Sequence, residues 1–156
     1  MYLTGGIPNT LRYTVWTTSV WRKWEINAFF IIENVVTNNY CNEISPGEKM
    51  IQAAKNVAST LQPGVGMLLL RDYGRYDEAQ LKLGTSRGKR LGDNFYVKHD
   101  GTRCYYFTLE DLETLFVQHA QLELVECNYI TRTYTNRSSQ GTRNRVWVQA
   151  RFRKPL

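Results

Sequence analysis

The clearest hydrophobic pattern lies between residues 45 and 64. Ser45, Pro46 and Glu48 form a helix-start signature, because serine caps, proline suits the first helical position and glutamate completes a capping box. Apolar residues then recur at helical spacing: Met50, Ile51, Ala54, Val57, Ala58 and Leu61. The Pro-Gly pair before Val65 ends the pattern. The sequence predicts one amphipathic helix that packs its apolar side on a core.

An unbroken apolar run follows at once, from Val65 to Leu70. A short run of this kind after a helix and a Pro-Gly turn is typical of an interior strand of a parallel sheet, which helices cover on both faces. Such a strand is expected not to alternate. A further strand is expected from about residue 24 to residue 37, where β-branched and aromatic side chains dominate.

Residues 74–103 have the composition of a long loop, with Gly84, Gly88 and Gly92 among many basic side chains. Asp100-Gly101 is a turn signal between two short strand-like pieces, Phe95–Lys98 and Arg103–Phe107. Loops of this length in compact domains are usually functional or mobile.

A second helix is expected to begin at Thr108, where Phe107 and Leu112 are spaced for a hydrophobic staple. Two strands finish the chain, at about 123–133 and 145–153, and the second alternates apolar and polar residues cleanly. The order of elements predicts an α/β layout that ends in an antiparallel hairpin.

Composition narrows the class of protein. A chain of 156 residues, 42% of them hydrophobic, is long enough for one domain with a core. No apolar run approaches the roughly 18 residues of a membrane span, and no secretory signal is evident. Three widely separated cysteines show neither metal spacing nor a disulfide framework. We therefore expect a protein of a reducing compartment, the cytoplasm, with no membrane and no metal among its partners.

The net charge of +6 is concentrated at one end. After Cys127 there is no acidic residue, and seven residues are basic: Arg132, Arg137, Arg143, Arg145, Arg151, Arg153 and Lys154. The remaining chain carries 13 basic and 14 acidic residues, a balance of −1. A basic end of this kind attracts phosphate polymers or anionic lipid. A solvated edge strand protected by its charges explains it equally well.

Polar residues follow the apolar run abruptly: Arg71, Asp72, Tyr73 and Tyr76. Ligands of open parallel sheets bind outside the carboxyl ends of the strands, so these residues are candidates for a site. Arginine can grip a phosphate and tyrosine can stack on a base. An internal Arg71–Asp72 ion pair is the plainer alternative.

The presumed loop adds cations interleaved with aromatic side chains. The cations are Lys82, Arg87, Lys89, Arg90, Lys98 and Arg103, and the aromatics are Phe95, Tyr96, Tyr105 and Tyr106. Positive charge with stacking faces is what an unpaired nucleic-acid strand needs. The alternative is a basic loop whose aromatic rings fill the core.

Three blocks carry a family resemblance: "RDYGRYD" at 71–77, "NFYV" at 94–97, and Asp100-Gly101-Thr102-Arg103 followed by Tyr105-Tyr106-Phe107-Thr108. With them, residues 44–156 resemble the C-terminal half of the methyltransferase-like family that forms 3-methylcytidine in the anticodon loop of tRNA. Residues 1–43 do not resemble that family and stay unassigned.

The resemblance implies the C-terminal half of a class I, Rossmann-like methyltransferase fold, with S-adenosylmethionine as cofactor. Its parallel sheet would close with an antiparallel hairpin, and Val65–Leu70 would be the fifth strand. Asp72 would be the catalytic carboxylate that faces the positive charge formed on the methylated base. The residues implied in substrate binding are Arg71, Tyr73, Tyr76, Asn94, Phe95, Tyr96 and Arg103.

The family's glycine-rich turn and ribose-binding acid are not visible in residues 1–43. We therefore expect a fragment that binds S-adenosylmethionine poorly. The first reading is a tRNA methyltransferase represented by its substrate-side half, with tRNA and a helper protein such as an aminoacyl-tRNA synthetase as partners. The alternatives are a catalytically dead RNA-binding module and a protein-interaction module.

Overall fold

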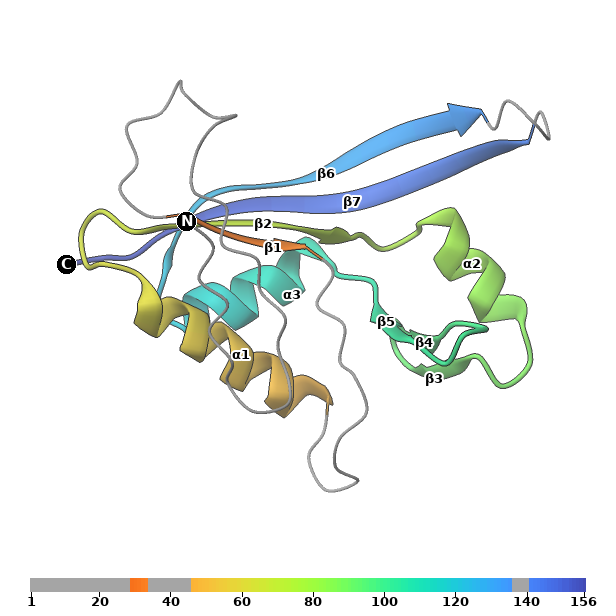
Figure 1. Cartoon of the computed structure of the whole chain (residues 1–156), viewed down its shortest axis with the longest axis horizontal. Helices are drawn as coiled ribbons and strands as arrows, with labels where there is room; N and C mark the ends of the chain where they lie inside the picture. Colours follow the sequence, from red (N-terminus) through yellow and green to blue (C-terminus); the bar gives the residue numbers. More distant parts are fainter. Residues whose placement is uncertain (1–28, 34–45, 136–140) are drawn as a thin grey trace.

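The computed structural model describes residues 29–33, 46–135 and 141–156, and its centre is a four-stranded sheet. The strand order is β1 (Phe29–Glu33), β2 (Met67–Tyr73), β7 (Thr142–Arg153) and β6 (Glu123–Thr135). β1 and β2 run parallel, whereas β7 is antiparallel to both β2 and β6 (Figure 1).

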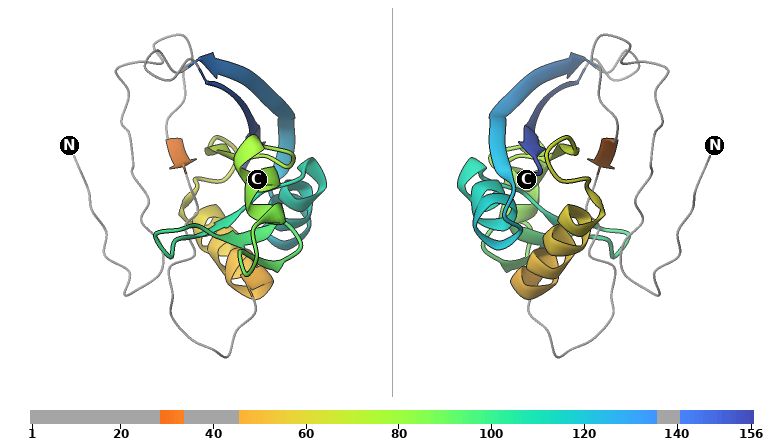
Figure 2. Two further views of the ribbon diagram at one scale, coloured as in Figure 1. Left: turned by 90° about the vertical axis from the view of Figure 1, so that its right-hand side faces the viewer. Right: turned by 90° about the vertical axis from the view of Figure 1, so that its left-hand side faces the viewer.

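One face of this sheet is covered by two helical segments, which lie on the same side in the end-on views (Figure 2). They are α1 (Pro46–Thr60) and α3 (Leu109–Glu113), the latter continuing as a π-helical turn over Thr114–His119. The helices and strands share one apolar core, which includes Ala54, Ala58, Leu68, Leu70, Leu112, Phe116, Val148, Ala150 and Phe152. None of the helices in the described residues is long and apolar enough to cross a membrane.

The predicted first helix is confirmed as α1, and the strands before and after it, β1 and β2, pair in parallel. α1 carries the predicted apolar face, with Met50, Ala54, Val57, Ala58 and Leu61 all buried. The strand expected at 24–37 is present at its centre as β1, in register with β2 from Phe29↔Met67 to Glu33↔Arg71. The rest of that strand and the Ser45 cap lie outside the described residues.

The interior strand differs from the prediction. β2 runs from Met67 to Tyr73, so Arg71, Asp72 and Tyr73 are part of the strand and do not follow it. Its burial alternates along its length, with Leu68, Leu70 and Asp72 facing the core. Of the three pairings in the described four-stranded sheet only β1–β2 is parallel, so a predominantly parallel sheet is not observed there. The closing hairpin is confirmed, and its second strand is the one that pairs with β2.

The expected long loop at 74–103 was a wrong prediction. It folds into α2 (Glu78–Thr85) and a small antiparallel sheet of β3 (Arg90–Gly92), β4 (Phe95–Val97) and β5 (Arg103–Tyr105). Strands of three residues are too short to show an alternating pattern. The predicted turn between β4 and β5 is confirmed, since Gly101 has φ +82° and the Asp100 carboxylate accepts the N–H of Thr102.

The second helix begins where the sequence predicts it. Thr108 and Asp111 form a reciprocal capping box, in which each side chain accepts the other residue's backbone N–H. The hairpin is longer than expected at its loop end, where its strands reach Thr135 and Thr142.

Candidate functional site

α2 and the small sheet form a unit mounted on the carboxyl end of β2. Asp77 anchors it: its fully buried carboxylate caps α2 through the N–H of Ala79 and also accepts from Arg145 Nε (2.8 Å) and the N–H of Val146 (3.0 Å). Burial alone would lower the pKa of Arg145, but the neighbouring Asp77 carboxylate outweighs it and raises that pKa. A charge-assisted contact therefore fixes the unit to β7.

A groove of about 450 Å³ runs between α2 and the β3–β4 hairpin. We name it the α2 groove. Its lining residues are Arg75, Tyr76, Gln80, Leu81, Gly84, Arg90, Asp93, Asn94 and Tyr96. Three of the residues that the sequence predicts for substrate binding meet here: Tyr76, Asn94 and Tyr96. They come from positions up to 20 residues apart, and the folding of the supposed loop brings them together.

The side chain of Gln80 connects two walls of the α2 groove by hydrogen bonds. Its Oε1 accepts the N–H of Tyr76 (2.6 Å), and its Nε2 donates to Asn94 Oδ1 (3.2 Å). Tyr76 and Asn94 both have positive φ, +68° and +56°, a region that residues other than glycine seldom adopt. Conformations of this kind cluster at functional sites, where the surrounding structure holds them.

Tyr76 is the most accessible aromatic ring of the α2 groove, with 64% of the residue exposed. The guanidinium of Arg75 lies 5.0 Å from the centre of that ring. Arg90 stands on the opposite wall, in an exposed ion pair with Asp93. An accessible ring flanked by two arginines can stack on a base and hold a phosphate.

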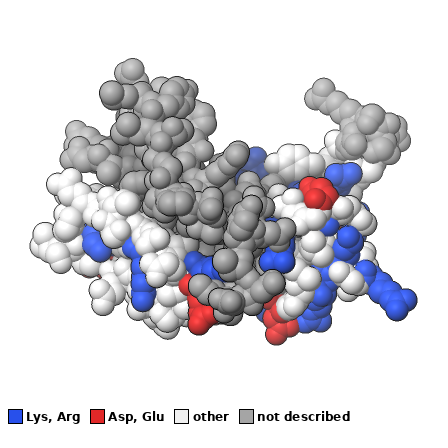
Figure 3. Space-filling model, turned by 60° about the horizontal axis from the view of Figure 1, so that its bottom comes forward, with Lys and Arg blue, Asp and Glu red and all other residues white. Residues whose placement is uncertain are grey.

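The surface around the α2 groove is basic. Residues 75–103 contain seven Lys or Arg residues and four Asp or Glu residues, an excess of three positive charges, and one of the acids is the buried Asp77. Figure 3 shows Lys and Arg side chains gathered at the end of the molecule that carries α2 and the small sheet. This charge favours a polyanionic partner.

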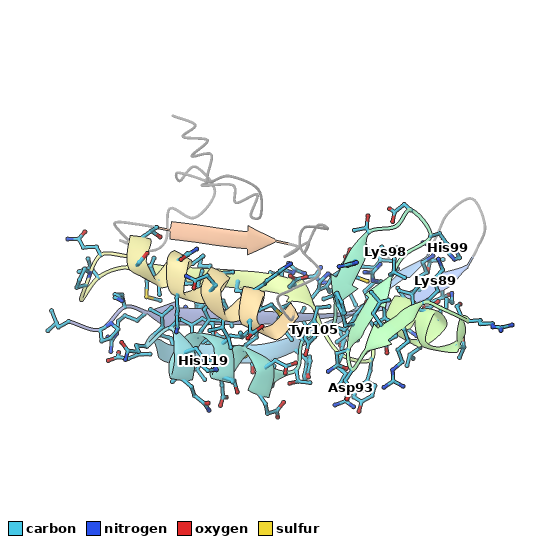
Figure 4. All side chains as sticks on the ribbon, turned by 90° about the horizontal axis from the view of Figure 1, so that it is seen from below. Lys89, Asp93, Lys98, His99, Tyr105 and His119 are labelled. Carbon is cyan, nitrogen blue, oxygen red and sulfur yellow. The ribbon has the colours of Figure 1, made fainter. Side chains whose placement is uncertain are left out.

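A second cleft, of about 480 Å³, lies between α1, α3 and the small sheet. Phe95 and Tyr105 line it together with Asp93, Asp111 and His119. Tyr105 donates to Asp111 Oδ2 (3.4 Å), and burial followed by the Asp111 charge raises its pKa. Figure 4 shows Tyr105 near the N-terminal end of α1, with Asp93 and His99 at opposite ends of the small sheet. Because Asp93 lines both clefts, they are neighbours.

Arg71 and Tyr73 lie on the face of β2 opposite the main core, and Tyr73 packs there against a second, smaller core of Leu83, Tyr96, Cys104 and Tyr106. The guanidinium of Arg71 is 4.9 Å from the ring centre of Trp147. Tyr73 stacks on Tyr106 at 5.7 Å, and Lys98 and Arg145 each stand 5.1 Å from its ring. The plainer alternative of an Arg71–Asp72 ion pair is not among the contacts that the structure shows for Arg71.

Asp72 and Arg103 are placed differently from the other candidates. Asp72 is 4% exposed, accepts the N–H of Tyr73 (2.7 Å) and lines neither cleft. Arg103 is exposed on β5 and also lines neither cleft. The roles assigned to both residues stay predictions.

Three polar residues of the α2 groove were missed, Arg75, Gln80 and Asp93, and Arg90 was named only among the cations of the presumed loop. A signal for α2 was present, because Asp77 followed by Glu78 is a helix-start pattern and the next residues favour helix. Recognising that helix would have placed Gln80 one turn from Tyr76.

Neither Cys104 nor Cys127 is activated as a nucleophile, and the described residues offer no cluster of metal ligands. Burial raises the pKa of the Cys104 thiol, and it raises the pKa of Cys127 to about 11, so both stay protonated at neutral pH. Within the described part of the chain no three His, Cys, Asp or Glu side chains gather as metal ligands.

Comparison with known proteins identifies the relatives of the chain. Over 109 residues it is 49% identical to tRNA N(3)-cytidine methyltransferase METTL2 of Bos taurus and 50% identical to tRNA N(3)-cytidine methyltransferase METTL2B of Homo sapiens. Each match covers 70% of this chain and 28% of the relative, so the chain spans little more than a quarter of their length. No family model matches the chain.

The structure supports the same fold class. A SAM-dependent methyltransferase from Methanosarcina mazei superposes with a TM-score of 0.52, covering 82% of this chain and 59% of the other. At 16% identity this likeness concerns the fold alone. It confirms the α/β methyltransferase-like fold that the sequence predicts.

Proposed function

We propose that the chain, which is 49–50% identical to tRNA N(3)-cytidine methyltransferases over about 70% of its length, is a substrate-binding part of such an enzyme. The proposal is that the α2 groove and the basic surface around it hold the tRNA anticodon loop. The observation that carries it is the groove itself, where an exposed tyrosine stands between two arginines on a positively charged unit.

The chemistry of cytidine methylation fits a site built for positioning. The N3 atom of cytosine is largely unprotonated at neutral pH and attacks a methyl group without a strong base. Catalysis then depends on orientation and on stabilising the positive charge that develops on the ring. In our proposal Tyr76 stacks on a base of the loop, Arg75 and Arg90 hold phosphates, and Asp72 is the carboxylate near the cationic product.

The cofactor of the family would supply the methyl group. The segment that follows β1 lies outside the described residues, and β2 continues into Gly74-Arg75-Tyr76 and not into a glycine-rich turn. No glycine-rich turn of the kind that holds this cofactor follows β2 in the described residues. We propose that the isolated chain binds it poorly, and isothermal titration calorimetry showing tight binding would refute this point alone.

Binding of an anticodon stem-loop RNA tests the proposal directly. Fluorescence anisotropy of the labelled RNA should show an affinity that falls by about an order of magnitude or more between about 50 and 200 mM salt, because phosphate contacts release counterions. Tyr76→Ala should cost about 1–3 kcal/mol of binding free energy through lost stacking. Arg90→Ala should reduce the slope of the salt dependence by about 1.

Lys55→Ala is the matched control, because Lys55 is an exposed cation on α1 that lines neither cleft. It should leave both affinity and slope nearly unchanged. If the RNA does not bind, or if Lys55→Ala weakens binding as much as Arg90→Ala, the α2 groove is not the tRNA site.

A further inference from the structure

β6 is a long edge strand with an unusually apolar surface. Its 13 residues exceed the usual strand length of about 3–10, and on its outer side no described strand pairs with it (Figure 1). Of the nine large hydrophobic side chains that are exposed in the described residues, four belong to β6: Leu124, Val125, Tyr129 and Tyr134. A long, apolar, unpaired edge is a template for another strand.

The usual protection of such an edge is weak here. β6 contains no proline, and it has one irregularity, near Leu124 and Glu126. Its two acidic residues are engaged with the neighbouring strand, Glu123 with Arg153 and Glu126 with Arg151. Arg132 stands directly opposite Arg145 in the β6–β7 register, which places like charges side by side.

The sequence of β6 is complementary to itself when it is read in the opposite direction. An antiparallel pairing centred on Tyr129 sets Glu126 opposite Arg132, Cys127 opposite Thr131, and Asn128 opposite Ile130. The charge pair occurs twice, once on each side of the centre. Each pair offers Arg132 an opposite charge, in which Glu126 contacts Arg132 of the other copy as well as Arg151 of its own chain.

We propose that β6 is a self-association edge, through which two copies of the chain pair antiparallel about a twofold axis at Tyr129. The contact is isologous, so the same patch serves both copies and the assembly closes at two. The two four-stranded sheets join into one sheet of eight strands, which lies within the ordinary size of open sheets. This inference does not depend on the proposed tRNA function.

The mass of the full chain in solution tests this proposal, measured by size-exclusion chromatography with light scattering over a series of concentrations. The wild-type chain should be dimeric at the higher concentrations. Arg132→Glu should weaken the dimer by at least about tenfold, because it sets two glutamates opposite each other at both ends of the pairing. The same change also places a glutamate opposite Arg145 within the chain, so the fold itself is not weakened.

Arg143→Glu is the matched control, an identical charge change on the exposed start of β7 and away from the edge. It should leave the dimer intact. A mixing experiment separates the pairing from other effects: Glu126→Lys and Arg132→Glu should each be monomeric alone and form a heterodimer when mixed. A wild-type chain that is monomeric at every concentration, or two variants that fail to associate on mixing, would overturn the proposal.

Discussion

Gln80 fixes the geometry of the α2 groove at the scale of single residues. Its amide accepts the backbone N–H of Tyr76 on one wall and donates to the side-chain oxygen of Asn94 on the other. Both of these residues have positive φ. Without that amide, Tyr76 and Asn94 are free to relax to ordinary backbone conformations. The groove is then no longer organised before RNA binds, and binding must pay the ordering cost.

Gln80→Ala should therefore weaken binding of the stem-loop RNA by about three- to tenfold, the size expected from one or two lost hydrogen bonds. Anisotropy titrations measure the affinity, and circular dichroism confirms that the variant is folded. Gln52→Ala is the matched control, since Gln52 bonds only to Asn56 on the exposed side of α1. Equal affinities for the two variants would mean that Gln80 does not position the groove.

Asp72 is the second residue whose role can be tested alone. Asp72→Asn, made at the matching position of a full-length relative, should lower methyl transfer by about a hundredfold or more, since it removes a carboxylate near the developing charge. The affinity for tRNA should stay nearly the same, because Asp72 is buried and lines neither cleft. Single-turnover methylation and anisotropy measure the two quantities. Unaltered turnover would exclude the catalytic role.

At the scale of elements, the position of α2 depends on two acids at its start. Asp77 accepts from Ala79, Arg145 and Val146, and Glu78 accepts the N–H of Asn144 (2.7 Å). Hydrogen bonds from Lys82 and from that N–H lower the pKa of Glu78. The start of α2 and the start of β7 are therefore one structural unit.

Asp77→Ala should lower the free energy of unfolding by about 2–4 kcal/mol, because it removes a helix cap and leaves Arg145 and Val146 without their acceptor. Urea unfolding followed by circular dichroism measures the loss. Asp77→Asn keeps an acceptor for the cap but loses the charge, so it should fall between Asp77→Ala and the wild type. Asp93→Ala, a change at an exposed ion pair, should stay within about 0.5 kcal/mol of the wild type. A negligible effect of Asp77→Ala would show that α2 is held by its apolar contacts instead.

β1 belongs to the part of the chain that the family resemblance left unassigned. It nevertheless pairs with β2 in parallel over five residues. A strand beside β2 requires only a short apolar or β-branched segment whose backbone N–H and C=O groups can pair with β2. The sequence Phe-Phe-Ile-Ile-Glu provides such a segment.

At the scale of the whole molecule, stability should depend on alkaline pH through groups that burial keeps neutral. Burial is the largest cause that raises the pKa of Cys127, from 9.0 to about 11. A pKa that is higher in the folded state contributes stability that is complete below pH 9 and is lost as the pH rises towards 11. Urea midpoints should therefore fall from pH 9 to pH 11. Cys127→Ala should fall less steeply, and an identical slope would exclude this contribution.

The extent of sequence-based prediction varied with the length of each pattern. α1 and the long hairpin were predicted because their periodicity extends over many residues, so local sequence and tertiary contacts agree. The sheet pairing and the short strands were not, because three residues carry no period and strand neighbours are chosen by contacts distant in sequence. The sequence predicted the candidate residues as one cluster, whereas the structure distributes them among the α2 groove, the second cleft and the two faces of β2.

The sequence by itself determined the elements with long patterns, the basic character of the chain and its resemblance to a tRNA-modifying family. Only the tertiary structure separated the candidate residues: Tyr76, Asn94 and Tyr96 line the α2 groove, Arg71 lies on Trp147, Tyr73 packs against the small core of the α2 unit, and Asp72 is buried. The physical reason is that alternate residues of a strand point to opposite faces. A shift of the β2 register by one residue would therefore move each side chain to the other face of the sheet. The pairing of β2 with β7 fixes this register, and so it decides which residues face the core.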